Sequence, residues 1–406
     1  MFIERLALRA FRNIARAELE IRAATVVLIG DNGAGKTNTL EALYLCATGR
    51  AFHPLPTLAL LGDATQTADI RARFHSQGVR HEVEVKLAPR RRSVRVDDRA
   101  LRQVSQLLGL VNVVAFFADD LRVVKDAPEY RRRFLDRAVA GGRPAFVETA
   151  QAYQKVLRSR NALLRRGSGG VRRDLLTVCD EQLVSYGTAL TRWRAAALRE
   201  LTPHVQLFAA HILGSRSVHL ALETGFGGSA DVDDDVLRER FAHALQQATP
   251  RDIARGLTHV GPHRADLRLL LNARDARLYA SQGQQRALVL SLKMAELTGL
   301  KERVKAAPLL LLDDVSSELD AGRNAALFRL VAQLGCQTWV STTGAVKLPL
   351  IGDFQAFHVS SGVLSPRPGA SFAAHDSASV PTSVPTSVPA FVGPPGLALS
   401  ESGKLF

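Results

Sequence analysis

The sequence has 406 residues, 46% of them hydrophobic, which can fill a sizeable core and, at about 150 residues per domain, allows two or three domains. Its formal net charge of +14 favours a polyanionic partner, either nucleic acid or an acidic membrane surface. No apolar run approaches the roughly 18 residues of a membrane-spanning helix, and charges throughout the first segment argue against a signal peptide. The three cysteines, Cys46, Cys179 and Cys336, lack the spacing of a zinc site or a disulfide framework, so we expect a cytoplasmic protein.

The N-terminal part of the chain predicts an α/β fold. The β-branched run Thr25–Ile29 predicts a strand that ends at Gly30 and is followed by a helical pattern. From Arg71 to Asp98, apolar and polar residues alternate around turn-like breaks, which indicates antiparallel strands with one solvated face. We therefore expect a small antiparallel sheet beside a unit of strand, loop and helix.

The middle of the chain has helical periodicity. From Leu176 to Ala197, apolar residues recur at alternating steps of three and four, and Phe146 to Leu164 keep nearly the same spacing. The glycine-rich stretch Gly167–Gly170 separates the two runs, which predicts an antiparallel helical hairpin. Its outer faces carry many arginines, a pattern that fits either a solvated surface or contact with DNA.

After Val260 the α/β pattern returns. A helix is predicted over Ser281–Leu300, a buried strand over Leu309–Leu312 and a last strand over Gln337–Ser341. From Ser371 to Phe406 the chain is rich in proline, serine and threonine. This composition predicts a disordered tail, because it cannot bury enough apolar surface to offset the entropy of ordering.

A phosphate-binding loop is indicated by GDNGAGKT at Gly30–Thr37, which matches GxxxxGK[ST] between a predicted strand and a predicted helix. The glycines let backbone N–H groups close around phosphate oxygens, while Lys36 reaches the β and γ phosphates and Thr37 ligates Mg²⁺. We therefore predict that the chain binds ATP. The predicted binding residues are Gly30, Asp31, Asn32, Gly33, Ala34, Gly35, Lys36, Thr37 and Asn38.

Two acidic residues, Asp313 and Asp314, directly follow the predicted buried strand Leu309–Leu312. Carboxylates at the C-terminal end of a buried strand lie where ligands bind in α/β sheets. Asp313 is predicted to ligate Mg²⁺ together with Thr37, and Asp314 to orient or deprotonate a water. Lys36, Asp313 and Asp314 are thus the candidate catalytic residues, and the long separation between them indicates a large insertion that includes the helical hairpin.

A third motif, SQGQ, lies at the start of the predicted helix that precedes the aspartates. A serine, a glycine and a helix N-terminus make a second phosphate-binding surface. Two such surfaces for one nucleotide predict that Ser281, Gly283 and Gln284 contact the nucleotide of a partner subunit.

Two arginine runs are candidate DNA contacts, namely Arg90, Arg91 and Arg92 at a predicted hairpin tip and Arg131 and Arg132 before the helical region. For Arg131 and Arg132 the alternative is a structural salt bridge with Asp136 or Asp120. Aromatic residues make up 6% of the chain and do not interleave with the basic runs, which argues against base stacking. DNA binding is therefore expected to depend weakly on base sequence and steeply on salt.

The order of these motifs resembles the ABC-type ATPases of chromosome maintenance and double-strand-break repair, and among them the bacterial RecF family of recombination mediators. The matching segments are GDNGAGKTN at Gly30–Asn38, TGRAF at Thr48–Phe52, DLRVVKDAPEYRRRFLD at Asp120–Asp136, RSRNALL at Arg158–Leu164, HVGPHRADL at His259–Leu267, SQGQQRALVLSLKMAE at Ser281–Glu296 and LLLLDDVSSELD at Leu309–Asp320. The GPH segment, the SxGQ motif and SELD together distinguish the RecF family from its relatives.

The resemblance implies an α/β, ABC-type P-loop ATPase lobe, split into residues 1–118 and 259–370 and containing the small antiparallel sheet. An all-helical lobe of residues 119–258 is inserted in it, and residues 371–406 form the tail. Each ATP, with Mg²⁺, would lie between Gly30–Thr37 of one subunit and Ser281–Gln284 of the other in a homodimer that forms on ATP. Residues Ser316–Asp320 would communicate across the dimer, and Thr342 or Thr343 would sense the γ-phosphate.

For function, the resemblance implies ATP-dependent binding of single-stranded, gapped and junction DNA in recombinational repair, replication-gap processing and SOS induction. RecR and RecO would be partners in loading RecA, and a weak DNA-stimulated ATPase would release the DNA. Asp314 stands where many ABC ATPases have a glutamate, which favours slow hydrolysis. Two alternatives are a nucleotide-binding subunit of a membrane transporter, disfavoured by the arginine-rich hairpin, and a DNA scaffold that does not hydrolyse ATP, disfavoured by intact Lys36, Asp313 and Asp314.

Overall fold

The computed structural model describes residues 1–52, 55–62, 65–107, 109–167, 172–214, 216–315, 320–343 and 348–367. The predicted disordered tail, residues 371–406, lies outside the described residues. So do residues 316–319 of the predicted communication loop and residues 168–170 of the predicted glycine turn.

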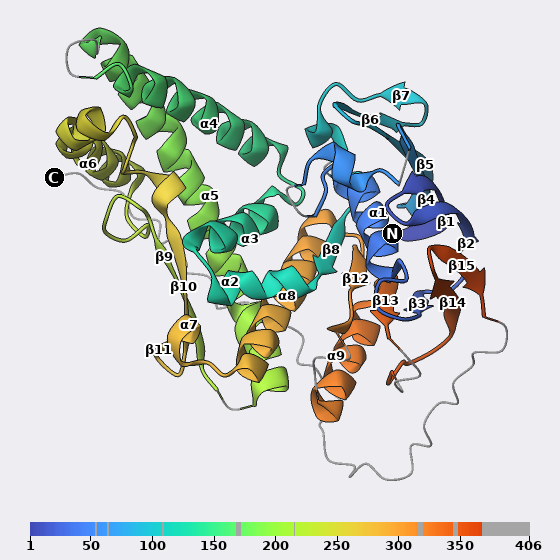
Figure 1. Ribbon diagram of the computed structural model, residues 1–406. Helices are drawn as coiled ribbons and strands as arrows, with labels where there is room; N and C mark the ends of the chain where they lie inside the picture. Colours follow the sequence, from blue (N-terminus) through green and yellow to red (C-terminus); the bar gives the residue numbers. More distant parts are fainter. Residues whose placement is uncertain are drawn as a thin grey trace, which may run out of the picture. The chain divides into compact units, whose positions relative to one another are not determined.

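The predicted strand Thr25–Ile29 is β3, near the centre of a six-stranded sheet (Figure 1). The order of strands is β15-β14-β3-β13-β12-β8. The other members are β8 (Val113–Phe116), β12 (Leu309–Leu312), β13 (Thr338–Thr342), β14 (Phe354–Ser360) and β15 (Val363–Pro366). All neighbours pair in parallel except β15, which pairs antiparallel with β14 at the edge. The carboxyl ends of β3, β12 and β13 therefore meet at one edge of the sheet.

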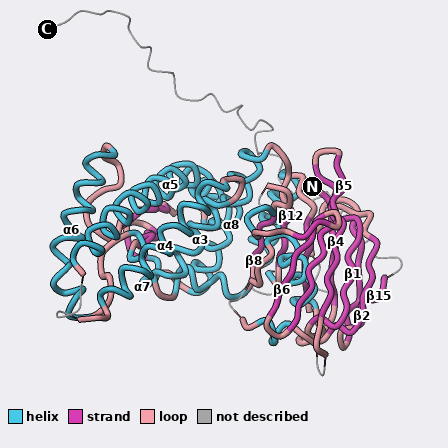
Figure 2. Tube along the Cα trace, turned by 90° about the horizontal axis from the view of Figure 1, so that it is seen from above, coloured by secondary structure: helices cyan, strands magenta, loops and turns pink. Residues whose placement is uncertain are grey.

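A second six-stranded sheet is antiparallel, in the order β2-β1-β4-β5-β6-β7 (Figure 2). Its strands are β1 (Phe2–Phe11), β2 (Ile14–Glu20), β4 (Ala68–Ser76), β5 (Val79–Ala88), β6 (Arg91–Val96) and β7 (Arg99–Ala100). Buried and less buried residues alternate along β4 and β5, so one face packs inward and the other carries charges. The predicted alternation over Arg71–Asp98 is confirmed, and β1 and β2 add two strands from the start of the chain.

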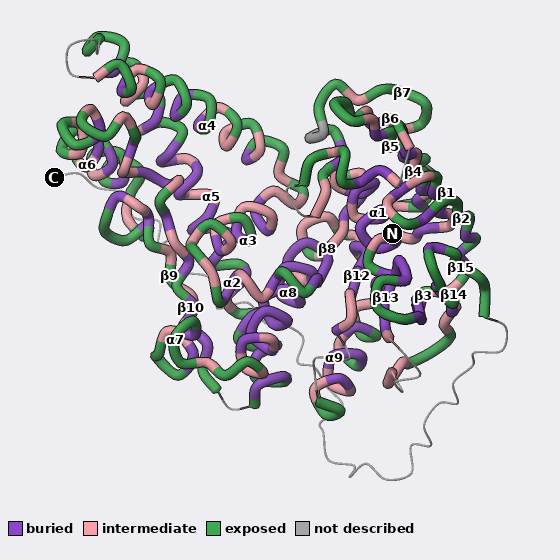
Figure 3. The backbone as a smooth tube through the Cα atoms, viewed as in Figure 1, coloured by how far each residue is buried: buried purple, intermediate pink, exposed green. Residues whose placement is uncertain are grey.

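The parallel sheet packs on both faces. Leu309 and Leu311 of β12 belong to a core that includes α1 (Lys36–Thr48) and the inner face of the antiparallel sheet. Leu310 and Leu312 point the other way, into a core with α8 (Gln282–Val304) and α9 (Ala321–Leu334). All four leucines are buried, as the continuous apolar run predicts for a parallel strand (Figure 3).

The middle of the chain is mostly helical, with α2 (Arg122–Lys125), α3 (Pro128–Ala140), α4 (Pro144–Leu164), α5 (Arg173–Leu213) and α6 (Asp234–Arg255). Helices α4 and α5 pack against each other, which confirms the predicted hairpin (Figure 1). Leu183, Leu190 and Ala197 of the predicted apolar run are buried. Helix α5 continues well past Ala197 and packs against α8, which the periodic run did not predict.

The described part of the segment 119–258 contains a strand, although we expected this segment to be all helical. This strand, β9 (Val218–Glu223), pairs with β10 (Asp266–Leu271), which in turn pairs with β11 (Arg274–Asp275). A short helix, α7 (Ala276–Tyr279), connects β11 to α8. Among the described residues, short 3-10 turns lie at Thr57–Leu60, Val104–Leu107, Ala118–Leu121 and Pro262–Arg264.

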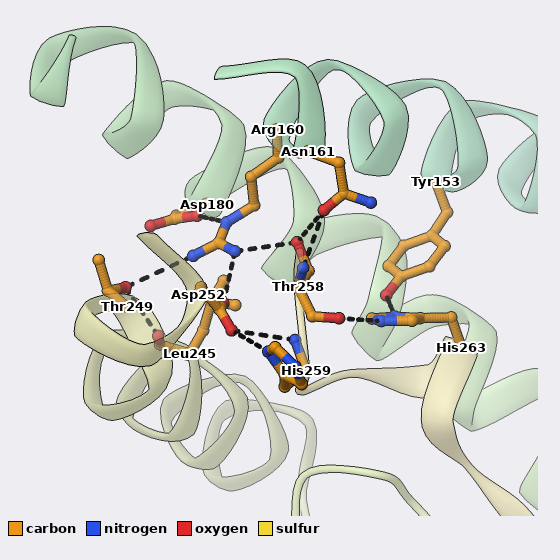
Figure 4. Close-up of polar contacts among 10 residues, drawn as sticks. All are labelled: Tyr153, Arg160, Asn161, Asp180, Leu245, Thr249, Asp252, Thr258, His259 and His263. Carbon is orange, nitrogen blue, oxygen red and sulfur yellow. Dashed lines mark hydrogen bonds and ion pairs between the residues drawn. The ribbon is translucent and has the colours of Figure 1, made fainter. Parts of the chain in front are cut away.

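A buried arginine joins three of the helices. The Arg160 side chain is fully buried on α4, and its guanidinium lies 2.6 Å from carboxylate oxygens of both Asp180 and Asp252 (Figure 4). The same guanidinium donates to the Thr258 hydroxyl at 2.9 Å. Such a charge is tolerated inside a protein only when paired and hydrogen-bonded, so this cluster fixes α4 against α5, α6 and the segment that leads to β10.

That segment approaches α4 closely at Gly261. Its φ is +134°, and a Cβ there would lie 2.7 Å from the Tyr153 hydroxyl oxygen, so a side chain is excluded. The Tyr153 hydroxyl is 2.6 Å from Nδ1 of His263, whose Nε2 is 3.1 Å from the Thr258 carbonyl oxygen (Figure 4). Burial lowers the pKa of His263 to about 4, so this histidine is neutral at pH 7.

No helix within the described ranges combines the length and apolar character needed to cross a membrane.

Candidate nucleotide-binding site

The predicted phosphate-binding loop connects β3 to α1. Gly33 and Gly35 have φ of +78° and +119°, which residues with a Cβ rarely adopt. Gly30 is required for another reason, because a Cβ there would lie 2.0 Å from the Val359 carbonyl oxygen on β14. No side chain caps the start of α1. The first N–H groups of α1 and its positive dipole end are therefore available to an anion.

The Lys36 side chain folds back over this loop. It is buried, and its ammonium donates to the carbonyl oxygens of Gly30 and Asp31 at 2.8 Å each. An ammonium in this position is placed to meet phosphate oxygens that the loop encloses, as the motif predicts.

The loop meets Asp313 at the end of β12. The Thr37 hydroxyl lies 3.0 and 2.9 Å from the two carboxylate oxygens of Asp313. The hydroxyl of Ser341, at the end of β13, donates to Asp313 Oδ1 at 2.6 Å. The structure therefore brings Thr37 and Asp313 together as predicted. Ser341, which the sequence did not single out, is the third member of this cluster.

The cluster suits a magnesium ion. Burial raises the pKa of Asp313, while the hydrogen bonds from Ser341 and Thr37 favour its ionised form. Within the described residues, no group of three or more His, Cys, Asp or Glu side chains could hold a metal by itself. One hydroxyl and one carboxylate are what a protein commonly supplies to Mg²⁺ when nucleotide phosphates and waters complete its coordination.

The other predicted residues at this edge lie close by. Asp314 has φ of +49°, and its N–H donates to the Ser341 hydroxyl at 2.9 Å, which holds this left-handed conformation. Thr342 ends β13, and its carbonyl accepts from the Gly30 N–H at 3.3 Å. The Thr342 hydroxyl is buried without a hydrogen-bond partner in the described part of the chain. Thr342 thus lies beside the phosphate-binding loop, where a sensor of the γ-phosphate is expected.

Asn13, in the turn between β1 and β2, supports the loop from outside. Its amide nitrogen donates to the Gly33 carbonyl at 3.1 Å, and its amide oxygen accepts from the Asn38 side chain at 2.8 Å. Sequence reasoning missed Asn13 because it is far from the loop along the chain. The only available signal was an asparagine in a short turn between two strands.

The motif SQGQ caps α8. The Ser281 hydroxyl accepts from the Gln284 N–H at 3.3 Å, and Gln284 Oε1 accepts from the Ser281 N–H at 2.8 Å, which is a capping box. Ser281 is exposed, and Gly283 and Gln284 are partly exposed. No hydrogen bond among the described residues joins this motif to Gly30–Asn38. Figure 1 shows the start of α8 beside α7, whereas α1 lies beside the strands of the parallel sheet.

Arg131 and Arg132 have structural contacts. Arg131 is buried and makes a two-pronged ion pair with Asp266, with N–O distances of 2.6 and 2.9 Å. Arg132 donates to the Ala265 carbonyl at 2.7 Å, and burial lowers its pKa. The alternative of a structural salt bridge thus holds for Arg131, but its partner is neither Asp136 nor Asp120. Those two carboxylates bind other cations.

The second arginine run lies at the tip of the hairpin between β5 and β6, as predicted, but its side chains do not all point the same way. Arg90 lies in the turn before β6, and Arg91 and Arg92 occupy successive positions of β6, so their side chains leave opposite faces of the sheet. Burial and the nearby Arg50 lower the pKa of Arg92. Arg90 and Arg91 remain candidates for contact with phosphates.

Comparison with known proteins agrees with these features. Residues 2–349 match the family model of the RecF/RecN/SMC N-terminal domain. The chain is 40% identical over 365 residues to the DNA replication and repair protein RecF of Anaeromyxobacter sp. (strain Fw109-5), covering 89% of this chain and 98% of the relative. It is 38% identical over 373 residues to the protein of the same name in Geobacter metallireducens (strain ATCC 53774 / DSM 7210 / GS-15), covering 90% and 100%.

Solved structures show the same relationship. The recombination mediator protein RecF with ATP, of the RecFOR pathway, matches with a TM-score of 0.84 at 28% identity and covers 90% of this chain and 97% of that one. An Smc head bound to the C-terminal winged-helix domain of ScpA matches with a TM-score of 0.54 at 15% identity, covering 90% and 97%, and shows the fold alone. The expected α/β, ABC-type fold is thereby confirmed. Because the family model matches most of the chain and the relatives align over nearly their whole length, the chain belongs to the RecF family.

Proposed function

We propose that this chain is an ATP-dependent DNA-binding protein of recombinational repair, replication-gap processing and SOS induction, acting in the cytoplasm. The observation that carries the proposal is the contact of Thr37 with Asp313 beside a glycine loop folded for phosphates. Support for the biological role comes from relatives named DNA replication and repair protein RecF and from a RecF structure with ATP. That family match also argues against the transporter alternative.

In this proposal each side chain of the site has one task. The N–H groups at the start of α1 and the Lys36 ammonium bind the phosphates. Thr37 and Asp313 hold Mg²⁺, which neutralises phosphate charge when bound, and Ser341 keeps the Asp313 carboxylate oriented. Asp314 takes a proton from the attacking water. Its side chain is shorter than glutamate, which fits the slow hydrolysis expected of a switch.

A second copy of the chain completes the site in this proposal. The SQGQ motif starts a long helix with an accessible N-terminus, and no hydrogen bond ties it to the loop of its own chain in the described residues. We place Ser281, Gly283 and Gln284 against the nucleotide of the partner in an ATP-dependent homodimer. Residues 1–118 and 259–370 would form the ATPase lobe, and residues 119–258 the inserted lobe.

DNA and the proteins of the RecFOR pathway are the proposed partners. We infer binding to single-stranded, gapped and junction DNA and cooperation with RecR and RecO in loading RecA, on the strength of the family and of the relative's place in that pathway. The net charge of +14 supports a polyanionic partner. Release of DNA would follow ATP hydrolysis.

Light scattering with and without ATP tests the dimer. We expect the wild type to dimerise on ATP, Lys36→Met to stay monomeric, and Ser281→Arg to bind ATP without dimerising. Lys155→Met and Ser185→Arg are matched controls, because both residues are exposed on helices α4 and α5 and should leave the dimer intact. A wild type that stays monomeric with ATP would refute the shared site.

Phosphate release on gapped DNA under multiple turnover tests the switch against a non-hydrolysing scaffold. We expect slow release by the wild type and about 100-fold slower release by Asp314→Asn, because a general base contributes a factor of at least that order. Asp235→Asn is the control, since Asp235 is exposed at the start of α6. No release by the wild type would favour the scaffold, and an unchanged rate in Asp314→Asn would remove its assigned role.

A further inference from the structure

The outer face of the antiparallel sheet has an uneven charge pattern. The strand register aligns its side chains in three rows that cross β2, β1, β4 and β5. The first row is Glu20, Arg5, Arg73 and Glu82; the second is Glu18, Ala7, Arg71 and Glu84; the third is Arg16, Arg9, Asp69 and Lys86. The first row is neutral and the second carries one net negative charge. The third row carries two net positive charges.

The carboxylates on this face are already paired with other cations. Arg73 lies 3.1 Å from Glu82, and Arg71 lies 3.1 Å from Asp69. Arg5 pairs with Glu18, and Lys86 also approaches Asp69, at 3.9 Å. The excess charge of the third row therefore belongs to the two arginines that lie next to each other in it.

Those two residues, Arg9 and Arg16, make no direct ion pair in the described part of the chain, although their charges add to the larger effect of Arg5 in lowering the pKa of the neighbouring Glu18 carboxyl. Both are exposed, they stand directly opposite each other on β1 and β2, and neither makes a hydrogen bond or ion pair within the described residues. Side chains opposite each other in a sheet start about 5 Å apart, and like charges there destabilise the pair. An anion between the two guanidinium groups would remove this repulsion.

The two arginines line a shallow hollow of about 160 Å³ on the sheet. Five arginines and three carboxylates border it, so its surroundings are positive. Guanidinium groups present flat pairs of donors that match phosphate oxygens. None of the cations that border the hollow is buried, so a free phosphate would be held weakly there. A phosphate that is part of a polyanion fits the hollow better, because a polyanion gains affinity from many weak contacts and from the release of counterions.

The site is also connected to the nucleotide loop. The turn that joins β1 to β2 carries Asn13, which donates to the Gly33 carbonyl. Arg9 and Arg16 lie on the two strands that lead into and out of this turn. A ligand bound between Arg9 and Arg16 would therefore lie on the same hairpin that supports the phosphate-binding loop.

We propose that Arg9 and Arg16 form a binding site for a backbone phosphate of DNA. The proposal rests on the proposed function, because it assigns part of the DNA-binding surface. The register places Arg91 of the predicted run on the same outer face, on β6, and Arg9 and Arg16 add two residues that neither predicted run includes. Contact is with the phosphate alone, so the site does not select a base sequence.

The test compares two double variants of the full chain. Arg9→Gln/Arg16→Gln removes the unpaired arginines. Arg5→Gln/Arg73→Gln removes the same amount of charge from the neutral row of the same face. Binding of a fluorescein-labelled gapped duplex is measured with ATP over a range of salt concentrations. Because each phosphate contact contributes about one unit to the slope of log affinity against log salt, and the two arginines share one phosphate, we expect the first variant to lower that slope by about one and the control by less than half of that.

Further measurements separate the outcomes. Thermal unfolding should show Arg9→Gln/Arg16→Gln at least as stable as the wild type, because a repulsive pair is removed. ATP-dependent dimerisation of that variant should be unchanged.

Equal losses of slope in both double variants, or none in the first, would overturn the site while leaving the proposed function intact. If the wild type binds no DNA, both fail. If inorganic phosphate at 10 mM displaces the duplex from the wild type at constant ionic strength, the site takes free phosphate, and the assignment to DNA fails.

Discussion

Replacing Ser341 by alanine tests whether the serine organises the candidate catalytic edge. The Ser341 hydroxyl is fully buried at the end of β13, donates to Asp313 Oδ1 at 2.6 Å and accepts from the Asp314 N–H at 2.9 Å. Ser341→Ala removes both bonds and adds no bulk. It leaves the Asp313 carboxylate with one donor fewer and the Asp314 N–H without its acceptor.

The expected cost follows from these two bonds. A hydrogen bond to a charged group contributes about 1.5–3 kcal/mol, and a buried N–H left without a partner costs about 1–3 kcal/mol. Since the two effects share one hydroxyl and do not add fully, we expect the free energy of unfolding to fall by about 2–4 kcal/mol. A buried serine elsewhere, Ser291, bonds only to the carbonyl of Ala287 in its own helix, so Ser291→Ala should cost about 1 kcal/mol or less.

The pH dependence has a definite sign. Burial raises the pKa of Asp313 above its usual value of 3.8, so the stability that its protonated form contributes is present below pH 3.8 and is lost as pH rises through the folded-state pKa. Without Ser341, the ionised carboxylate loses a donor, and the pKa rises further. The difference in unfolding free energy between wild type and Ser341→Ala should therefore be larger at pH 8 than at pH 5.

Urea denaturation at pH 5 and pH 8 measures these differences in unfolding free energy. Titration with Mg²⁺ at a fixed concentration of a fluorescent ATP analogue measures how much Mg²⁺ the nucleotide-binding site needs. We expect Ser341→Ala to need more Mg²⁺ for half-maximal binding. A cost equal to that of Ser291→Ala, with no dependence on pH and an unchanged Mg²⁺ requirement, would refute the role given to Ser341.

Three further predictions concern the support of the site and the buried polar cluster. Asn13→Ala should weaken binding of a fluorescent ATP analogue several-fold with little change in the urea midpoint, because it frees the phosphate-binding loop from its support; unchanged affinity would contradict this. Arg160→Met removes the cation beside Oδ2 of the buried Asp252 carboxylate and leaves only the contacts of Oδ1 with His259, so it should lower the free energy of unfolding by about 3–5 kcal/mol in urea. Exposed Arg158→Met should change it by less than about 0.5 kcal/mol. Because burial lowers the pKa of His263 from 6.5 to about 4, its contribution to stability is complete above pH 6.5 and is lost as pH falls towards 4, by up to about 3 kcal/mol. As pH falls from 6.5 towards 4, the urea midpoint of His263→Gln should therefore fall less than that of the wild type. Parallel pH profiles of the two proteins would disprove this role of His263.

Much of the fold could be predicted where neighbouring residues determine the local structure. The glycine loop, the buried strand Leu309–Leu312 and the helix capped by Ser281 were predicted because backbone freedom, apolar runs and caps act over a few residues. The strand β9 was not predicted, because it pairs with β10 on the far side of α6 in sequence. Its alternation over six residues is weak evidence by itself.

The candidate site likewise contains residues that local motifs predict and residues that only tertiary contacts bring into it. Lys36, Thr37, Asp313 and Asp314 belong to motifs whose chemistry is readable from residue type and spacing. Ser341 carries no such motif, and its role appears only because β13 lies beside β12 in the parallel sheet. The predicted ion-pair partners of Arg131, Asp136 and Asp120, were wrong because its true partner is distant along the chain. Asp266 reaches Arg131 only where β10 packs on α3.

The net charge of +14 shows what the sequence determines and what only the tertiary structure decides. Sequence alone established that the chain is basic, that it carries a phosphate-binding loop and that its motifs follow the order of the RecF family. Only the tertiary structure decided which arginines are already paired and which are not. Arg131 and Arg160 are neutralised inside the protein, whereas Arg9 and Arg16 face each other unpaired on the sheet. The physical reason is that pairing depends on strand register and helix packing, which bring together residues that no local pattern connects.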